Sequence, residues 1–545
     1  MSDHSNRIDA ITLEVLRNAI SAIADEMNAN LVRTSYSPNI KERRDCSSAV
    51  FDARGRMIAQ AESIPVHLGA MPYSVEAAIR HVPSFTAGDV VVLNDPYAGG
   101  AHLPDITFVA PVFVENRLIA FVANRAHHAD VGGKEPGSLA GDTVEIYQEG
   151  LRIPPIRLWR EGVLSDDLLQ LILANVRTPI ERWGDLCAQK SGCSVGIDRM
   201  HALCRREGVA LLTDAMSAVL DYSERRMRHQ ISQLPQGEAS FEDVLDDDGI
   251  SEGVIPIRVR VKIEDNRIDV DFSGSSNQVR GPVNAVFAVT ASATYYAVRA
   301  FADPEIPPNS GCYRPIEITA PEGSIVNACL PAPVVGGNLE TSQRIVDVVL
   351  GALGQLVPER SMAACQGSMN NVAVGGIDPR TGKPFTLYET IAGGFGARPT
   401  KDGIDGIHSH MTNTLNTPIE ALETSYPLRV ERYELRKGTG GRGRCRGGLG
   451  IRRDMTCLAE SVRVSFLTDR RTTCPYGVEG GEPGAPGKNV VIREGGEEVV
   501  LPSKGTTTLQ HGDTISIRTP GGGGYGSPKQ RSSDLRALDE RQGRI

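Results

Sequence analysis

The chain has 545 residues, 40% of them hydrophobic and 23% charged, which indicates a globular protein of several domains. Its net charge of -9 argues against a nucleic-acid-binding surface, because phosphate recognition requires a clustered basic excess. No apolar run reaches the roughly 18 residues of a membrane-spanning helix. The segment Met1–Arg7 is too polar for a secretory signal. Ten cysteines without a Cys-x-x-Cys pair predict reduced thiols, so we expect a cytoplasmic protein.

The first predicted element is a helix over residues 8–33, where apolar residues recur every three or four positions. A short strand is expected at 47–51. Asp45 stands at the mouth of that strand, and both a surface salt bridge and a metal-ligand role remain open for it. His67 lies in a predicted tight loop before a helix at 73–81. It either satisfies backbone groups there or lines a pocket.

The most informative stretch follows the apolar run 90–93, which predicts a buried strand. Proline and glycine break this strand into a loop. The loop ends on His102 and Asp105, two side chains three positions apart that can both bind a metal. Two further strands are predicted at 106–114 and 118–123.

Directly after the third of these strands stand His127, His128 and Asp130. Imidazole and carboxylate groups are thus placed at the ends of strands that we expect to be neighbours. Zinc, manganese and iron favour this mixture of ligands. The sequence therefore predicts a divalent metal site, around which the rest of the chain is organised.

Residues 145–155 bring two carboxylates, a phenol and an arginine together beside an apolar stretch. Charged groups packed in this way can carry shifted pKa values, which makes Glu145 a candidate proton carrier. A structural network of ion pairs is the competing interpretation.

Helices are expected at 165–175 and 183–229. The second contains Gly192-Cys193-Ser194-Val195-Gly196, which matches the G-x-S-x-G pattern but lacks the preceding strand that a nucleophile elbow requires. The polar, acidic stretch 233–252 indicates a domain boundary. Beyond it we expect a hairpin at 255–272 and helices at 284–301 and 341–356.

The C-terminal part shows short alternating runs and many glycines from 426 to 526, which predict a β-rich region. His408 and His410 are candidate ligands of a second site. The nearest approach to a phosphate-binding loop, Gly484–Asn489, lacks the first glycine and the Ser/Thr of that motif. The chain therefore shows no ATP site of its own.

These patterns predict a mixed α+β, multidomain fold. We expect an N-terminal metal-site domain over 1–235, with a helical segment at 163–232, and a central α/β domain over 250–425. A C-terminal β-rich region over 426–526 and a charged, disordered tail over 527–545 would follow.

Several motifs together resemble the hydantoinase B/oxoprolinase family. This family includes the B-type subunit of ATP-dependent N-methylhydantoinase and is related to the metal-bearing subunits of acetone and acetophenone carboxylases. The resemblance covers nearly the whole chain. It is carried by Glu42–Asp45, Asn94–Tyr97, Gly100–Asp105, Ala126–Gly133 and Glu145–Gly150.

The resemblance implies metal ligands at Asp45, His102, Asp105 and one of the adjacent histidines His127 and His128. We favour His127, although the sequence leaves the choice open. Arg44 stands where the family often has glycine, beside the implied ligand Asp45.

The resemblance also implies a heteromeric enzyme that hydrolyses a cyclic amide such as hydantoin, 5-oxoproline or a lactam. An ATP-binding A-type partner would phosphorylate the substrate oxygen. A divalent metal (Zn or Mn, or else Fe) in this chain would then supply hydroxide to attack the activated carbon. Asp130, Glu145 or His67 would carry the proton. Two alternatives remain open: a subunit of an ATP-dependent ketone carboxylase of the acetone or acetophenone type, and a scaffold subunit with a structural metal.

Overall fold

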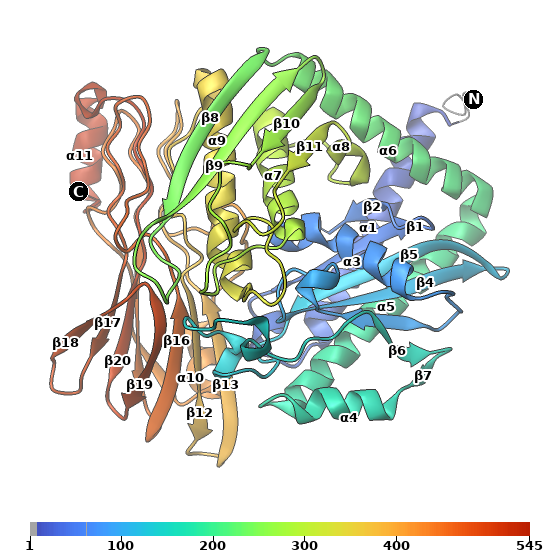
Figure 1. Cartoon of the computed structure of the whole chain (residues 1–545), viewed down its shortest axis with the longest axis horizontal. Coiled ribbons are helices and arrows are strands. Elements are labelled where there is room, and N and C mark those ends of the chain that lie inside the picture. The colour runs from blue at the N-terminus through green and yellow to red at the C-terminus, as the bar shows by residue number, and fades with distance from the viewer. Residues whose placement is uncertain (1–7, 62, 545) are drawn as a thin grey trace.

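The computed structural model describes residues 8–61 and 63–544 (Figure 1). Met1–Arg7, which we expected to carry no secretory signal, lies outside the described residues. Within the described ranges, sheets of seven, four, four and five strands combine with helices of up to 29 residues. The expected mixed α+β class is therefore confirmed. No helix in the described part of the chain has the length and apolarity needed to cross a bilayer.

The seven-stranded sheet belongs to the N-terminal part and has the order β2-β1-β5-β4-β3-β6-β7, with every neighbouring pair antiparallel. The strands predicted near 47, 90, 106 and 118 are confirmed as β1, β3, β4 and β5. The bounds are β1 Cys46–Asp52, β2 Met57–Gln60, β3 Val90–Leu93, β4 Asp105–Val114, β5 Arg117–His127, β6 Ile156–Arg160 and β7 Val163–Leu164.

Both faces of this sheet are buried, because alternate residues of one strand point to opposite sides. Val50 and Val122 pack in the large core that also contains residues of α1 (Ala10–Thr34) and α5 (Pro179–Glu207). Their neighbours Phe51, Phe121 and Ala123 pack instead in a separate cluster with residues of α3 (Pro65–His81). The sheet thus lies between helices that cover both of its faces. The polar side chains of Asp105 and His127 lie at the ends of strands β4 and β5.

Helix α3 differs from the prediction, since it begins at Pro65 and includes the whole segment expected to be a loop. Proline at the first helical position is well tolerated, because its missing N–H would have no partner there. Pro72 lies inside the helix. At Gly69 an added Cβ would lie 2.4 Å from Ser292 Oγ, so α3 packs closely on α7 (Phe287–Ala302). His67 therefore stands on the first turn of a packed helix.

The long helical segment predicted at 183–229 is two helices, α5 and α6 (Val209–Ser232). They are separated at Gly208, whose φ of 84° lies outside the helical region. Helix α4 (Asp166–Ala174) matches the prediction for 165–175. The G-x-S-x-G match lies within α5, as expected.

The second sheet has the order β11-β10-β9-β8, and the predicted hairpin is confirmed as β9 and β10. Helix α9 (Ser342–Leu356), also predicted, lies between the N-terminal part and the C-terminal strands (Figure 1). Strand β8 occupies the stretch expected to be a boundary, because its acidic side chains pair with arginines instead of remaining in solvent. The bounds are β8 Gly237–Leu245, β9 Ile255–Glu264, β10 Arg267–Asp271 and β11 Ile316–Thr319.

The remaining two sheets are formed by the C-terminal half. The order of one is β13-β12-β16-β19, so strands from both sides of the boundary expected at 425 pair directly. The order of the other is β14-β15-β20-β17-β18. The bounds are β12 Asn371–Asp378, β13 Lys383–Thr390, β14 Leu428–Leu435, β15 Ile451–Cys457, β16 Ser461–Leu467, β17 Lys488–Ile492, β18 Glu498–Leu501, β19 Lys504–Gln510 and β20 Thr514–Arg518.

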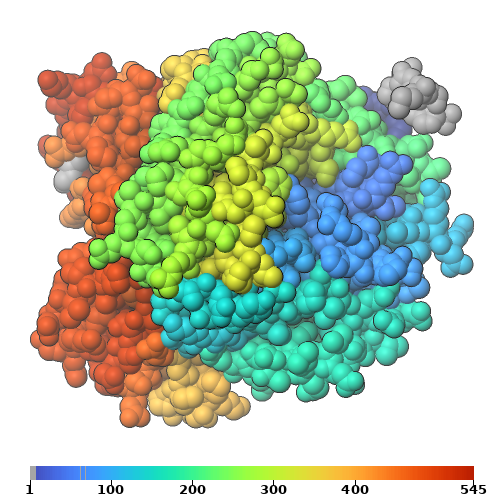
Figure 2. All heavy atoms as spheres, in the orientation of Figure 1, coloured from blue at the N-terminus to red at the C-terminus, as the bar shows by residue number. Residues whose placement is uncertain are grey.

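The C-terminal tail differs from the prediction of disorder over 527–545. It contains helix α11 (Ser533–Arg541). Arg531 binds Asp402 at 2.9 Å and Asp539 at 2.7 Å, so the charges that suggested disorder are paired with the body of the protein. Three short helices complete the set: α2 (Pro38–Lys41), α8 (Ser310–Tyr313) and α10 (Ile419–Ser425). In Figure 2 the orange and red C-terminal residues adjoin the green and cyan segments without a gap on the face shown.

Candidate metal centre

The register of β4 and β5 brings the two polar clusters of the N-terminal part together. Asp105, the first residue of β4, pairs with His127, the last residue of β5. His102 lies in the turn just before β4. The ligand atoms of these three residues all lie within 4.8 Å of one another, and all three residues are buried.

Each residue of this group has a free ligand atom close to those of the other two. His102 Nε2 lies 3.3 Å from Asp105 Oδ2, and the His102 and His127 rings are 5.0 Å apart. Within residues 8–61 and 63–544, both His102 ring nitrogens, both Asp105 carboxylate oxygens and His127 Nε2 lack a hydrogen-bond partner. Each buried polar atom left in this state costs about 1–3 kcal/mol. A cation that these atoms could bind together would offset that cost, so the group fits a metal.

Asp45 and His67 border the group from two other elements. His67 Nε2 lies 3.1 Å from Asp105 Oδ1 and 3.8 Å from Asp45 Oδ1. The backbone carbonyl of Asp45 accepts a hydrogen bond of 3.0 Å from the N–H of His127, which fixes the approach to β1 against the end of β5. Burial raises the pKa of Asp45, and the nearby Arg43 opposes that shift.

The surroundings of His127 include two residues that the sequence analysis missed. Asn39 Nδ2 lies 3.3 Å from His127 Nδ1 and donates to the His127 carbonyl at 2.6 Å. The ring of Tyr388 lies 4.4 Å from the His127 ring, and the Arg43 guanidinium lies 5.2 Å from the Tyr388 ring centre. Burial, and then His102, lower the pKa of His127 well below its usual value. The imidazole is therefore neutral, as a metal ligand must be.

His128, the other member of the adjacent pair, points away from the group. Its Nε2 lies 2.9 Å from Gln189 Oε1 on α5. Burial is the largest cause that lowers its pKa to about 4. Successive residues at the end of a strand point to opposite sides, so only one of two adjacent histidines can face Asp105.

The two proposed proton carriers from the following loop also lie outside the group. Asp130 accepts hydrogen bonds from the backbone N–H groups of Gly132, Gly137 and Arg177 and from the Arg177 guanidinium, at 2.9–3.1 Å. Through these contacts Asp130 stabilises the conformation of the loop. Glu145 is half-buried at the start of a short 3-10 turn over Ile146–Gln148.

Glu149, which the sequence analysis did not single out, is the buried carboxyl of this loop. It accepts hydrogen bonds from the N–H groups of Val334 and Val335, and burial raises its pKa to about 8. The only feature of the sequence that could have indicated a buried Glu149 is its position in the densely charged stretch that begins at Glu145. His408 and His410 belong to no group of three possible metal ligands among the described residues. His410 instead lies 3.3 Å from Asp347.

A family model described as hydantoinase B/oxoprolinase matches residues 9–528. This chain belongs to the hydantoinase B/oxoprolinase family. The resemblance noted in the sequence is thereby confirmed.

Relatives in this family differ in length. An uncharacterized protein of Methanocaldococcus jannaschii is 44% identical, and the match covers 99% of this chain and 94% of that protein. A protein of Pseudomonas sp., named as the B-type component of a D-/L-hydantoinase, is 34% identical, with 97% and 92% covered. A 5-oxoprolinase of Dictyostelium discoideum is 36% identical, but the match covers 97% of this chain and only 41% of that protein. The chain thus spans about two fifths of the 5-oxoprolinase.

Two solved structures share the fold. The ATP-dependent caprolactamase from Pseudomonas jessenii matches with a TM-score of 0.92 and 31% identity, over 99% of this chain and 94% of that one. Acetone carboxylase in a nucleotide-free state matches with a TM-score of 0.89 over 97% of this chain and 78% of that one. Its identity of 18% supports a shared fold and nothing finer.

Proposed function

We propose that this chain is the metal-bearing part of an ATP-dependent cyclic amidase that works with an ATP-binding A-type partner. The observation that carries the proposal is the convergence of His102, Asp105 and His127, with their ligand atoms free, in a member of this family. The likeness to a caprolactamase supports amide hydrolysis. The incomplete phosphate-loop motif supports a partner that binds ATP.

The residues that would hold the ion are His102, Asp105 and His127, with Asp45 as a further candidate. Two imidazoles and a carboxylate suit zinc, manganese or iron. When bound, such an ion polarises carbonyl groups and lowers the pKa of water to near neutrality.

The chain's own residues prepare the site for this chemistry. Asn39 holds His127 in place, and burial keeps its ring neutral, so a nitrogen lone pair is available. Burial would raise the pKa of Asp105, yet His67 and His102 keep that pKa well below its usual value, so the carboxylate stays ionised. The Tyr388 ring covers His127 on one side and excludes water there.

His67 is the residue to which we assign proton transfer. It lies between the carboxylates of Asp45 and Asp105, whereas Asp130 already accepts four hydrogen bonds in its loop. An imidazole can both accept and donate a proton, so a histidine placed beside two carboxylates suits this role.

The test is an assay of the complete complex with ATP and hydantoin, caprolactam or 5-oxoproline, with and without bicarbonate. We expect ring opening and phosphate release that require both subunits and no bicarbonate. His102→Ala should abolish turnover while the complex stays folded. Bicarbonate-dependent carboxylation of a ketone would instead support the carboxylase alternative. A loss of stability without a selective loss of turnover would support a structural metal.

A further inference from the structure

A cavity of about 390 Å³ lies between a glycine-bearing loop and the C-terminal tail. Residues within 440–449 line it from the loop, and residues within 528–544 line it from the tail. This volume falls within the range of about 300–1,000 Å³ that small-molecule sites occupy. In Figure 1 helix α11, which forms part of the wall, lies on the opposite side of the molecule from the seven-stranded sheet. The cavity is therefore separate from the candidate metal centre.

Positive charge dominates the wall of this cavity. Among the described residues that line it, six carry a cationic side chain and one, Asp539, carries a carboxylate. The cations are Arg442, Arg446, Lys529, Arg531, Arg536 and Arg544. The whole chain has a net charge of -9, so this cluster departs from its overall balance. A concave wall with one sign of charge concentrates ions of the opposite sign.

Three of the six cations are balanced by three carboxylates. The pairs, at 2.7–3.4 Å, are Arg446 with Asp405 and Asp539, Arg531 with Asp402 and Asp539, and Arg544 with Asp405. These ion pairs connect the tail to the body of the protein, so they give the cavity a fixed wall.

The other three cations, Arg442, Lys529 and Arg536, have no carboxylate partner within residues 8–61 and 63–544. Arg536 donates to the backbone carbonyls of Pro528 and Lys529 at 3.0 and 3.2 Å, which orients the guanidinium without neutralising it. Three like charges that line one cavity repel one another. An anion bound among them would remove that repulsion.

The kind and placement of these cations favour a phosphate group over a carboxylate. A guanidinium presents a planar fork of N–H donors that matches two oxygens of a phosphate. A phosphate group has three acceptor oxygens that point in different directions, whereas a carboxylate has two in one plane. The three cations come from three segments: the loop, the 3-10 turn Pro528–Gln530 and helix α11. Cations that approach from several segments suit the phosphate geometry better.

We propose that this cavity binds a compact anion with two phosphate groups, through Arg442, Lys529 and Arg536. Inorganic pyrophosphate and small diphosphate esters belong to this class. Each phosphate group carries about 1.5–2 negative charges at pH 7, so two of them match three cations. The cavity shares no residue with the candidate metal centre, so its ligand is independent of the function proposed above.

The test is calorimetric binding of sodium pyrophosphate to the full chain, with citrate, an anion of similar charge, as the comparison. We expect pyrophosphate to bind at least about tenfold more tightly, which corresponds to one charge-assisted hydrogen bond. The melting temperature should also rise with pyrophosphate concentration, because a ligand that binds only the folded chain stabilises it. Absence of pyrophosphate binding, or equal affinity for citrate, would overturn the proposal.

Variants at exposed positions locate the bound anion without disturbing the core. Arg442→Gln and Arg536→Gln should each weaken pyrophosphate binding at least about tenfold. Arg541→Gln removes the same charge from an exposed position of α11 that does not line the cavity. It should leave the affinity nearly unchanged in about 0.15 M salt, which screens charges more than about 8 Å apart. Equal losses in the two α11 variants would overturn the proposal.

Pyrophosphate also binds metal ions, so His102→Ala at the candidate metal centre serves as a second control. This variant should bind pyrophosphate as tightly as the wild type does. Binding that is lost in His102→Ala but kept in Arg442→Gln and Arg536→Gln would place the anion at the metal centre and overturn the proposal.

Discussion

Glu340 is a carboxyl group that the fold removes from water. It lies in the π-helical turn Gly337–Thr341, fully buried, with Oε1 accepting from the N–H of Met369. Burial, and then the charge of Asp469, raise its pKa to about 8 from an ordinary value of 4.5. Between these pH values the folded chain binds one more proton than the unfolded chain. The free energy of unfolding therefore falls as pH rises through this range.

Glu340→Gln should reduce this dependence on pH. The amide keeps the oxygen that accepts from Met369 but cannot ionise, so a contribution of up to roughly 1.4 kcal/mol per pH unit disappears. Chemical denaturation at pH 5, 6, 7 and 8 measures the effect, with Glu317→Gln on the exposed side of β11 as the control. Parallel curves for the Glu340 variant and the wild type would contradict the assignment.

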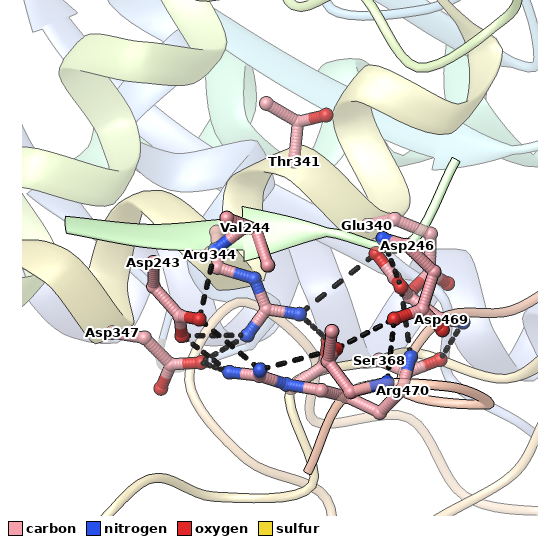
Figure 3. Close-up of polar contacts among 12 residues, drawn as sticks. Asp243, Val244, Asp246, Glu340, Thr341, Arg344, Asp347, Ser368, Asp469 and Arg470 are labelled. Carbon is pink, nitrogen blue, oxygen red and sulfur yellow. Dashed lines mark hydrogen bonds and ion pairs between the residues drawn. The ribbon is translucent and has the colours of Figure 1, made fainter. Parts of the chain in front are cut away.

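Elements from different parts of the chain are joined by a buried cluster of ion pairs. Figure 3 shows the guanidinium groups of Arg344 and Arg470 beside the carboxylates of Asp243 and Asp347. Arg344 lies 3.1 Å from Asp243 and 3.0 Å from Asp347, and Arg470 also contacts both acids. The cluster thereby links β8, α9 and the loop after β16.

Asp243→Asn should lower the free energy of unfolding by about 3 kcal/mol. The substitution leaves two buried guanidinium groups with less compensating charge, and breaking a buried pair costs that amount. Glu242→Gln, at the preceding residue of the same strand, removes an exposed pair with Arg258 and should cost less than about 1 kcal/mol. Similar losses in urea denaturation for both variants would contradict the role of the cluster.

The sequence predicted those helices and strands whose pattern of apolar residues lies within the element itself. The apolar run of β3 and the helical periodicity of α1 are examples. The start of α3 could not be predicted, because its close packing on α7 at Gly69 outweighs the cost of Pro72 inside the helix. Strand β8 was not predicted, because a run of acidic residues is typical of an exposed linker. The arginines that pair with these acids, such as Arg470, lie far away in the sequence.

In the candidate site, too, the sequence predicted the groups that are close along the chain and missed the contacts between distant segments. His102 and Asp105 share one turn, so their spacing alone placed them together. The choice between His127 and His128 depended on the β4–β5 register, which the sequence does not state. The environment of His127 includes Tyr388 from a different sheet, and nothing near His127 in the sequence indicates that contact.

The whole molecule is tied together across the boundaries expected from composition. Strand β12 pairs with β16, and α11 is anchored through Arg531 to Asp402. We therefore expect one cooperative unfolding transition. A fragment of residues 1–425 lacks β16 and β19, so it exposes a long edge of β12 and should aggregate. Solubility and circular dichroism of the fragment check this, and a soluble fragment with native-like helix content would contradict it.

The metal content of two adjacent-histidine variants tests the central claim most directly. The purified wild-type chain should contain about one divalent ion when measured by inductively coupled plasma mass spectrometry. His127→Asn removes a nitrogen that faces Asp105 and should lose that ion, whereas His128→Asn should keep it, because His128 faces Gln189. A full metal complement in folded His127→Asn, or an equal loss in both variants, would contradict a centre built on His102, Asp105 and His127.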